Sequence, residues 1–268
     1  MKSWGLQVFL MQLRKLVAYR LDFWVNFLGQ TLFSLLIAYF LWSSIFSSSL
    51  QANINGESLQ SMIFYYLMAP LVFRIQQGQG IGFLSREIYD GGLNKYLLYP
   101  IDYFKFKLSA YLANSFFFTL QLFAILCIYN LFFYDSTIYA FSFLYTLYFL
   151  ISLLIGTCTF FFYFSTAELL AFWFDNTWSL GVALRFITSF LGGALIPLSF
   201  FPEWSTKALA YTPFPYFINL PMLIIQQKIT HEKVFEQIFI SILWLIVFYF
   251  ISKFIWKKGN LVYSGVGI

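Results

Sequence analysis

Charged side chains are scarce in this chain. Asp, Glu, Lys and Arg together make up 10% of its 268 residues, whereas 60% of the residues are hydrophobic and 24% are aromatic. The mean hydropathy is +0.75. A soluble domain of this length cannot hide so large a share of apolar side chains from water. The composition therefore excludes an ordinary soluble protein and predicts an integral membrane protein.

Histidine and cysteine are also rare. The single histidine, His231, lies in the polar stretch HEKVFEQ, with no second His, Cys or clustered carboxylates at ligand spacing. We therefore expect it at the surface and expect no metal site. The two cysteines, Cys127 and Cys158, lie in apolar runs, which favours buried thiols over a disulfide.

Long runs without charge are the clearest feature that is present. No charged residue lies between Asp22 and Glu57, between Lys107 and Asp135, or between Asp135 and Glu168. Each run exceeds the about 20 residues that a helix needs to cross a bilayer, and the period-two alternation of a membrane barrel is missing. The sequence predicts an all-α protein forming a single transmembrane domain, 1–268. Its six expected transmembrane helices are 23–45, 59–81, 109–133, 138–163, 177–199 and 237–256.

The distribution of Lys and Arg predicts a multi-pass orientation in the cell membrane, the inner membrane of a bacterium, with both termini cytoplasmic. In this orientation only three basic residues, Lys207, Lys228 and Lys233, lie outside. The net charge of +5 then needs no nucleic-acid partner. The basic residues expected inside are Lys2, Arg14, Lys15, Arg20, Arg86, Lys95, Lys105, Lys107, Lys253, Lys257 and Lys258.

The first 22 residues have the pattern of a helix lying in the cytoplasmic membrane interface. Gln7, Arg14 and Lys15 fall largely on its polar side. The alternative is a simple anchor for the first span. The apolar residues at helical spacing are Leu6, Phe9, Leu10, Leu13, Leu16 and Val17.

The segment 84–100 is a charged cytoplasmic loop between the second and third spans. Leu84 to Asp90 can form two helical turns, Gly91 can end them in a left-handed conformation, and Gly92 loosens the residues after it. Pro100 then breaks the pattern, and Asp102 can cap the next helix. We expect Arg86, Glu87 and Asp90 to project towards the cytoplasm, on a short helix that another protein can push.

Five of the seven prolines fall in one segment, Phe190 to Lys228, which is mostly apolar. No single spanning helix tolerates this density of proline. We therefore expect broken helices that re-enter the outer leaflet over 200–235. Trp204, Tyr211 and Tyr216 suit the membrane interface.

Two arginines near or within the predicted spans allow two interpretations each. Arg74 either lines a transport path or reaches the surface from a span that ends early. Arg185 lies well inside the fifth span and needs a partner, for which Glu168 and Asp175 are nearest in sequence. A structural ion pair and a gating or substrate role remain equally open.

Two motifs resemble the membrane subunits of ABC exporters of the type-2 permease class. REIYDGGLNKYLLYP resembles the acidic, glycine-containing loop between helices two and three of that family. GGALIPLSFFPEW followed by TPFPYFINLP resembles its outer re-entrant signature. The resemblance implies ATPase coupling through Ser85, Arg86, Glu87, Asp90, Gly91 and Gly92. It implies an outer gate built from Gly192, Gly193, Pro197, Pro202, Trp204, Pro213, Pro215 and Pro221.

The same resemblance implies an exporter made of two membrane subunits, either two copies of this chain or this chain and a sister permease. The chain lacks the Gly-x-x-x-x-Gly-Lys phosphate loop, so ATP and Mg would be bound by a separate ABC ATPase subunit and no cofactor by this chain. Gly78, Gly80 and Gly82 lack the lysine of that motif, and we expect them to allow close helix approach or a bend.

Two other classes of function fit the sequence less well. A membrane enzyme needs a polar catalytic set facing one cavity, and the predicted spans hold no His and no paired carboxylates. An ATP-independent, ion-coupled carrier or channel could use Arg185 and Glu168 as a relay, although the inverted repeat typical of carriers is missing. This carrier or channel is the alternative to an ABC permease.

Overall fold

The computed structural model describes residues 4–18, 20–49, 53–78, 80, 82–99, 101–133 and 142–265. Three features of the sequence lie outside these residues: Lys2, Pro100 and the start of the predicted span at residue 138. Within the described residues the secondary structure is helical, apart from one isolated bridge between Ile54 and Glu57. The predicted all-α class is confirmed.

The described helices follow one another without any sheet between them. They are α1 (Trp4–Ala18), α2 (Arg20–Ser49), α3 (Leu59–Gln77), α4 (Ser85–Tyr89), α5 (Asn94–Leu98), α6 (Tyr103–Phe133), α7 (Phe143–Glu168), η1 (Leu169–Phe172), α8 (Trp178–Leu191), η2 (Leu198–Phe200), α9 (Glu203–Leu209), α10 (Phe214–Phe217), α11 (Asn219–Ile225) and α12 (His231–Val262).

Four helices are long and apolar enough to cross a bilayer. Their apolar stretches are Thr31–Ser48, Tyr103–Leu131, Phe143–Phe172 and His231–Val262, which belong to α2, α6, α7 with η1, and α12. These four correspond to predicted spans, and they make the chain a multi-pass membrane protein by length and composition.

The other two predicted spans coincide with shorter helices. α3 has 19 residues and contains Pro70. α8 has 14 residues, which rise about 21 Å against a hydrocarbon core of about 30 Å. It ends at Leu191 and not at residue 199, because Gly193 turns the chain with a φ of +99°. The layout with six spans therefore stays a prediction.

α7 is the central helix. Of its apolar stretch 67% is buried, against 11% for those of α2 and α12. Phe160 and Phe161 are fully buried, and Phe160 packs edge-on against Phe217 of α10 with 5.4 Å between ring centroids. Burial of such aromatic side chains is the main source of packing energy in this core. The exposed apolar sides of α2 and α12 suit contact with lipid.

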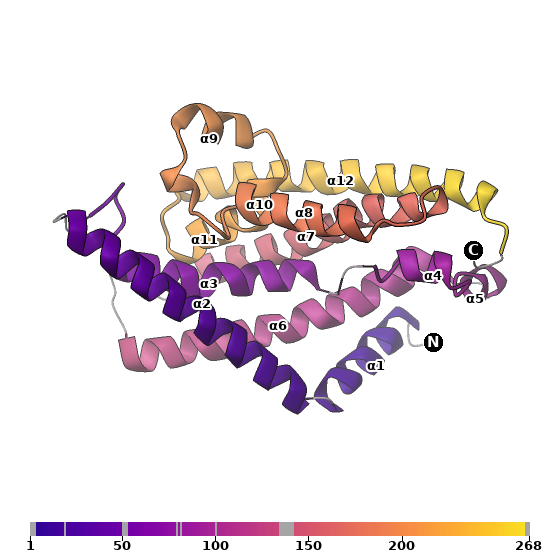
Figure 1. Cartoon of the computed structure of the whole chain (residues 1–268), viewed down its shortest axis with the longest axis horizontal. Coiled ribbons are helices and arrows are strands. Elements are labelled where there is room, and N and C mark those ends of the chain that lie inside the picture. The colour runs from indigo at the N-terminus through magenta and orange to yellow at the C-terminus, as the bar shows by residue number, and fades with distance from the viewer. Residues whose placement is uncertain are drawn as a thin grey trace.

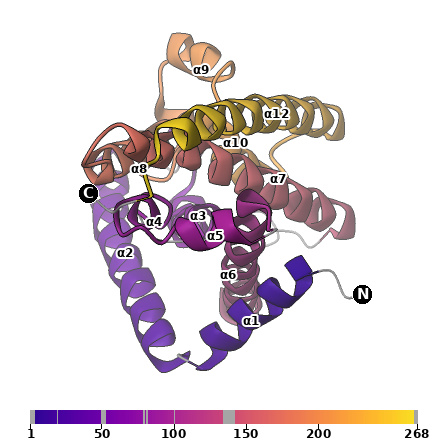
Figure 2. The ribbon, with the colours of Figure 1, turned by 90° about the vertical axis from the view of Figure 1, so that its right-hand side faces the viewer.

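The helices give the molecule two distinct ends. Figure 1 shows α4, α5 and the C-terminus at one end, and α9, α11 and the start of α3 at the other. The charged loop and the proline-rich segment, which the sequence assigned to opposite sides of a membrane, thus lie at opposite ends of the bundle. Figure 2 shows α1 and α2 forming a V on one side of the other helices.

α1 packs along α6. Phe9 lies against Phe116 with 5.9 Å between ring centroids, and Gln12 Nε2 donates to Asn114 Oδ1 at 3.3 Å. Gln7, Arg14 and Lys15 are all exposed, as their predicted polar side allows. Of the predicted apolar face, Phe9, Leu13 and Leu16 are half-buried while Leu6, Leu10 and Val17 are exposed. The position of α1 in a membrane interface stays a prediction.

Candidate functional site

The connection between α3 and α6, residues 78–102, contains the two short helices α4 and α5, and we call it the α4–α5 loop. Gly78 begins it at a close approach, since a Cβ added there would lie 2.7 Å from the Tyr111 ring. This agrees with the expectation of close helix approach for Gly78, whereas a Cβ added at Gly80 would meet nothing within 4 Å and one at Gly82 would make only ordinary contact. Gly91 has a φ of +70°, the left-handed conformation predicted for it, and follows Asp90, whose N–H donates to the Arg86 carbonyl at 2.8 Å.

Asp102 ends the loop and caps α6, as predicted. Its Oδ1 accepts the N–H of Lys105 at 2.9 Å, and its Oδ2 lies 3.5 Å from Lys253 Nζ. Partial burial raises the pKa of Asp102, but the hydrogen bond from Lys105 and the charge of Lys253 outweigh it, so the net pKa lies below its usual range. The carboxylate therefore stays ionised at neutral pH.

Glu87 does not project from the loop, so that prediction is wrong. Its side chain is 17% exposed and its Oε1 lies 2.6 Å from Lys107 Nζ. Its carboxylate also accepts the hydroxyls of Tyr96 at 3.1 Å and Tyr103 at 2.9 Å, with Lys95 Nζ at 3.6 Å. The physical reason is that Lys107, in the first turns of α6 and 11% exposed, needs a nearby counter-charge.

The Tyr96 hydroxyl is a hydrogen-bond donor in this cluster. Its pKa is raised by burial and by the nearby Glu87 carboxylate. The ring also lies beside Lys107, with 5.3 Å from Nζ to the ring centroid. Glu87 is thus the centre of a network that fixes the loop to α6.

The remaining loop residues with a predicted coupling role divide by exposure. Ser85 is buried, whereas Arg86 on the same short helix and Asp90 at its C-cap are exposed. Gly91 and Gly92 are half-buried. Of the three charged side chains expected to face outwards on α4 and its C-cap, two do so.

The loop is also tied to the α7–α8 turn and to the C-terminal residues. Tyr89 donates its hydroxyl to the Phe174 carbonyl at 2.8 Å, and Asn94 Nδ2 donates to the Gly265 carbonyl at 2.7 Å. Leu84, Ile88 and Leu93 form a small buried cluster with Tyr103 and Ala171.

Glu168 lies at the C-terminal end of α7 with 1% of its surface exposed. Its Oε1 accepts the N–H of Gly82 at 2.5 Å and its Oε2 accepts the N–H of Leu84 at 2.9 Å. The sequence offered Glu168 as a partner of Arg185 and did not predict these backbone contacts.

Arg185 and Arg74 contact side chains of neighbouring helices. Arg185 Nη1 donates to Gln77 Oε1 at 3.2 Å, and its guanidinium lies 5.1 Å from the Phe164 ring centroid. Arg74 lies in the last turn of α3 with its guanidinium 4.9 Å from the Phe118 ring centroid. α3 ends at Gln77, four residues before the predicted end of the span, which favours the interpretation that Arg74 lies near the membrane surface.

The proline-rich segment is folded into short helices, not an open loop. Its five prolines all lie at the N-cap or in the first turn of a helix, where a missing N–H is tolerated. Phe217 and Leu220 are 0% and 1% exposed, whereas Trp204 and Tyr211 are 75% and 83% exposed. The hydroxyl of Tyr65 in α3 donates to the Gly193 carbonyl at 2.8 Å and holds the start of the segment.

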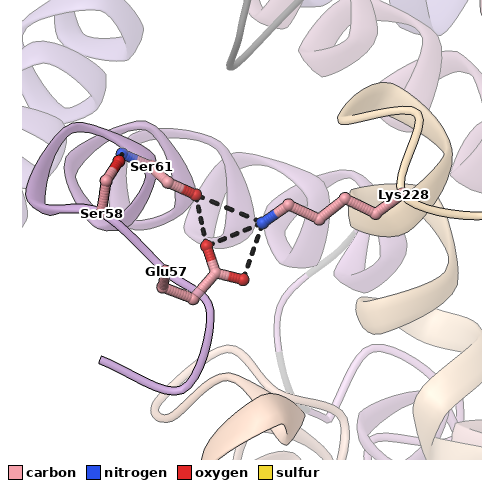
Figure 3. A network of polar contacts seen from close by, with 4 residues as sticks. All are labelled: Glu57, Ser58, Ser61 and Lys228. Atoms are coloured by element: carbon pink, nitrogen blue, oxygen red, sulfur yellow. Dashed lines mark hydrogen bonds and ion pairs between the residues drawn. The ribbon is translucent and has the colours of Figure 1, made fainter. Parts of the chain in front are cut away.

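An ion pair holds the C-terminal end of this segment against the start of α3. The sequence did not predict this ion pair. Lys228 Nζ lies 2.7 Å from both carboxylate oxygens of Glu57 and 3.2 Å from the Ser61 hydroxyl (Figure 3). Ser61 also donates its hydroxyl to Glu57, and Ser58 caps α3 by accepting the Ser61 N–H at 3.2 Å. No sequence signal joins residues so far apart along the chain.

A cavity of about 320 Å³ lies next to this ion pair. Glu57, Tyr65, Pro197, Tyr216 and Gln237 are among its lining residues. The proline-rich segment, α3 and the start of α12 therefore surround a cavity at this end of the bundle.

The described residues hold no group of three or more His, Cys, Asp or Glu side chains placed to bind a metal ion. His231 is exposed, as predicted, and its ring lies tilted against that of Tyr145 with 4.9 Å between ring centroids.

The chain is a multi-pass membrane protein. Its described residues form several apolar helices of membrane length, with a compact charged loop at one end of the bundle and proline-broken helices at the other. The sequence model of the ABC-2 family transporter proteins matches residues 32–267, so the chain belongs to this family of ABC permeases. The resemblance to type-2 ABC permeases is thereby confirmed. No curated protein gives a significant match to the chain.

Proposed function

We propose that this chain is the permease subunit of an ATP-driven exporter whose ATP-binding subunits are separate proteins. Two membrane subunits, either two copies of this chain or the chain and a sister permease, would enclose the path. ATP and Mg would be held by the partner ATPase. The chain would lie in the bacterial inner membrane with both termini cytoplasmic, and the outer segment with Gly192, Gly193 and its prolines would shape the exit.

The observation that carries the proposal is the construction of the α4–α5 loop. Its internal side is fixed through Glu87 to α6 and through Glu168 to α7, while Arg86 and Asp90 remain exposed. A short element that is rigidly attached to long helices transmits a push, whereas a flexible loop absorbs it. The two exposed charges, of opposite sign, provide specific contacts for a docking partner.

The test is affinity purification of the tagged chain from its native membrane in mild detergent. We expect an ABC ATPase to copurify with the wild-type chain and to be lost from the double variant R86E/D90K. The matched control is K257E, which reverses an exposed charge near the C-terminal end of α12, outside the loop. Figure 1 shows this end of α12 at the same end of the bundle as α4 and α5.

Recovery of the ATPase with R86E/D90K at the wild-type level would contradict coupling through this loop. A stable complex of the wild-type chain that contains no ATPase would contradict the proposal itself. That result would favour the ATP-independent carrier or channel and make Arg185 the next residue to test.

A further inference from the structure

The buried side chain of Glu168 joins the α4–α5 loop to α7. It contacts the residues just before α4, whose N–H groups have no hydrogen-bond acceptor within a helix. Gly82 and Leu84 lie just before α4, and their N–H groups point to Glu168 at 2.5 and 2.9 Å. A buried N–H without an acceptor is costly, and a buried carboxylate without donors is more so. Each side of this contact therefore needs the other.

The contact is surrounded by apolar packing on the same two elements. Leu84 is fully buried, Ile88 of α4 is 6% exposed, and both belong to a cluster with Ala171 of η1, three residues after Glu168. Water is thus kept from the carboxyl group, and hydrogen bonds are electrostatically stronger in such surroundings than in water.

The carboxylate also lies within electrostatic reach of Arg185 on α8. Arg185 in turn donates to Gln77, the last residue of α3. Glu168 therefore stands between the entry to the loop, the end of α7 and a charge on α8, three elements that come from separate parts of the sequence.

We propose that Glu168 is a positioning residue that transmits movement of the α4–α5 loop to α7 and α8. This inference rests on the proposed function, because it needs an ATPase that moves the loop. When the loop is displaced, the two N–H groups carry the carboxylate and the end of α7 with them. Besides this contact, the described residues join the loop to this side of the bundle through apolar surfaces and the Tyr89 hydroxyl bond, and apolar surfaces can slide.

The experiment measures transmission separately from docking. In a background without the native cysteines, Cys127→Ser and Cys158→Ser, we place one cysteine at the exposed Ser199 in the outer segment. The purified complex with its ATPase is treated with a maleimide, without nucleotide and after trapping with ATP and vanadate. The ratio of the two labelling rates reports movement at the far end of the bundle.

We expect E168Q to retain the ATPase and to reduce this ratio by about two- to thirtyfold towards one, the range found for residues that carry coupling. Glutamine keeps the size of the side chain but presents an amide N–H₂ to one backbone donor. E168D, which keeps the carboxylate on a shorter side chain, should give an intermediate ratio. The matched control is D175N, the same acid-to-amide change at an exposed residue of the α7–α8 turn.

A merely structural role would lower the thermal stability of E168Q and leave the ratio unchanged, and that result would overturn the inference. If E168Q does not accumulate in the membrane, E168D is the deciding variant. A ratio of labelling rates equal to that of the wild type overturns the inference, and a reduced ratio in a variant that still binds the ATPase supports it. A failure of this inference can be told from a failure of the proposed function. If the proposed function is wrong, no ATPase copurifies even with the wild-type chain.

Discussion

Glu87 and Lys107 meet where α4 lies against the first turns of α6. Their side chains are 17% and 11% exposed, whereas those of Glu203 and Lys207 in α9 are 91% and 78% exposed. Water screens the α9 pair almost completely but screens the Glu87 pair much less. Removing one partner of a largely buried pair leaves an uncompensated charge, which costs more than the pair contributes as a whole.

We therefore expect E87Q and K107M each to lower the free energy of unfolding by about 3 kcal/mol. The double variant should cost less than the two single changes added together, because neither charge is then left alone. Denaturant unfolding of the purified chain in detergent measures all three. The control pair E203Q and K207M should each change stability by no more than about 0.5 kcal/mol. If K107M is as mild as K207M, the Glu87 network does not hold the loop.

Among the elements, α12 comes unusually close to η1. A Cβ added at Gly259 would clash with Cδ2 of the Phe172 ring, and this ring is itself packed against Trp256 and Tyr263. The ring cannot swing away without disturbing both neighbours. Glycine at this position therefore sets the distance between α12 and η1, which directly follows Glu168.

We expect G259A to destabilise the protein by about 1–3 kcal/mol through overpacking, although alanine is the better helix former. The control is G29A in α2, where a Cβ meets nothing within 4 Å. There the gain in helix propensity should stabilise the protein by up to about 1 kcal/mol. Thermal unfolding of both variants in the same detergent gives the comparison. A G259A variant that is as stable as G29A would mean that α12 and η1 are not in this contact.

At the scale of the whole molecule, the features that the sequence predicted depend on local chemistry. A charge-free run must form a helix in lipid, Asp102 caps the helix beside it, and Gly91 supplies a left-handed turn. Each of these follows from a few consecutive residues. The four long helices and the folded proline-rich segment were predictable for the same reason.

The features that the sequence did not predict depend on tertiary contacts. The ion pair of Glu57 with Lys228 joins distant segments. Glu168 binds backbone N–H groups, which carry no signature in the sequence. Glu87 turns inwards on a helix of five residues, too short for any periodicity to indicate its inner face. Glycines shorten α8 relative to its apolar run.

The arrangement of the two ends predicts which residues a membrane-impermeant reagent can reach. Trp204 and Tyr211 are highly exposed in the outer segment, whereas Phe217 and Leu220 in the same segment are almost completely buried. Asp90, the C-cap of α4, and Lys257, near the C-terminal end of α12, are also exposed. Figure 1 shows α4 and the C-terminal end of α12 at the opposite end of the bundle. The orientation that we predict, with both termini cytoplasmic, places the first group outside the cell and the second group inside it.

We expect single cysteines W204C and Y211C, in the cysteine-free background, to react with an impermeant maleimide added to intact cells. F217C and L220C should react only after unfolding, and D90C and K257C only after the cells are opened. The alternation within one segment reflects short helices packed into the bundle, because a loop in water would expose every position. Uniform labelling from residue 204 to 220 would therefore contradict the folded outer segment, and labelling of D90C in intact cells would reverse the orientation on which ATPase docking depends.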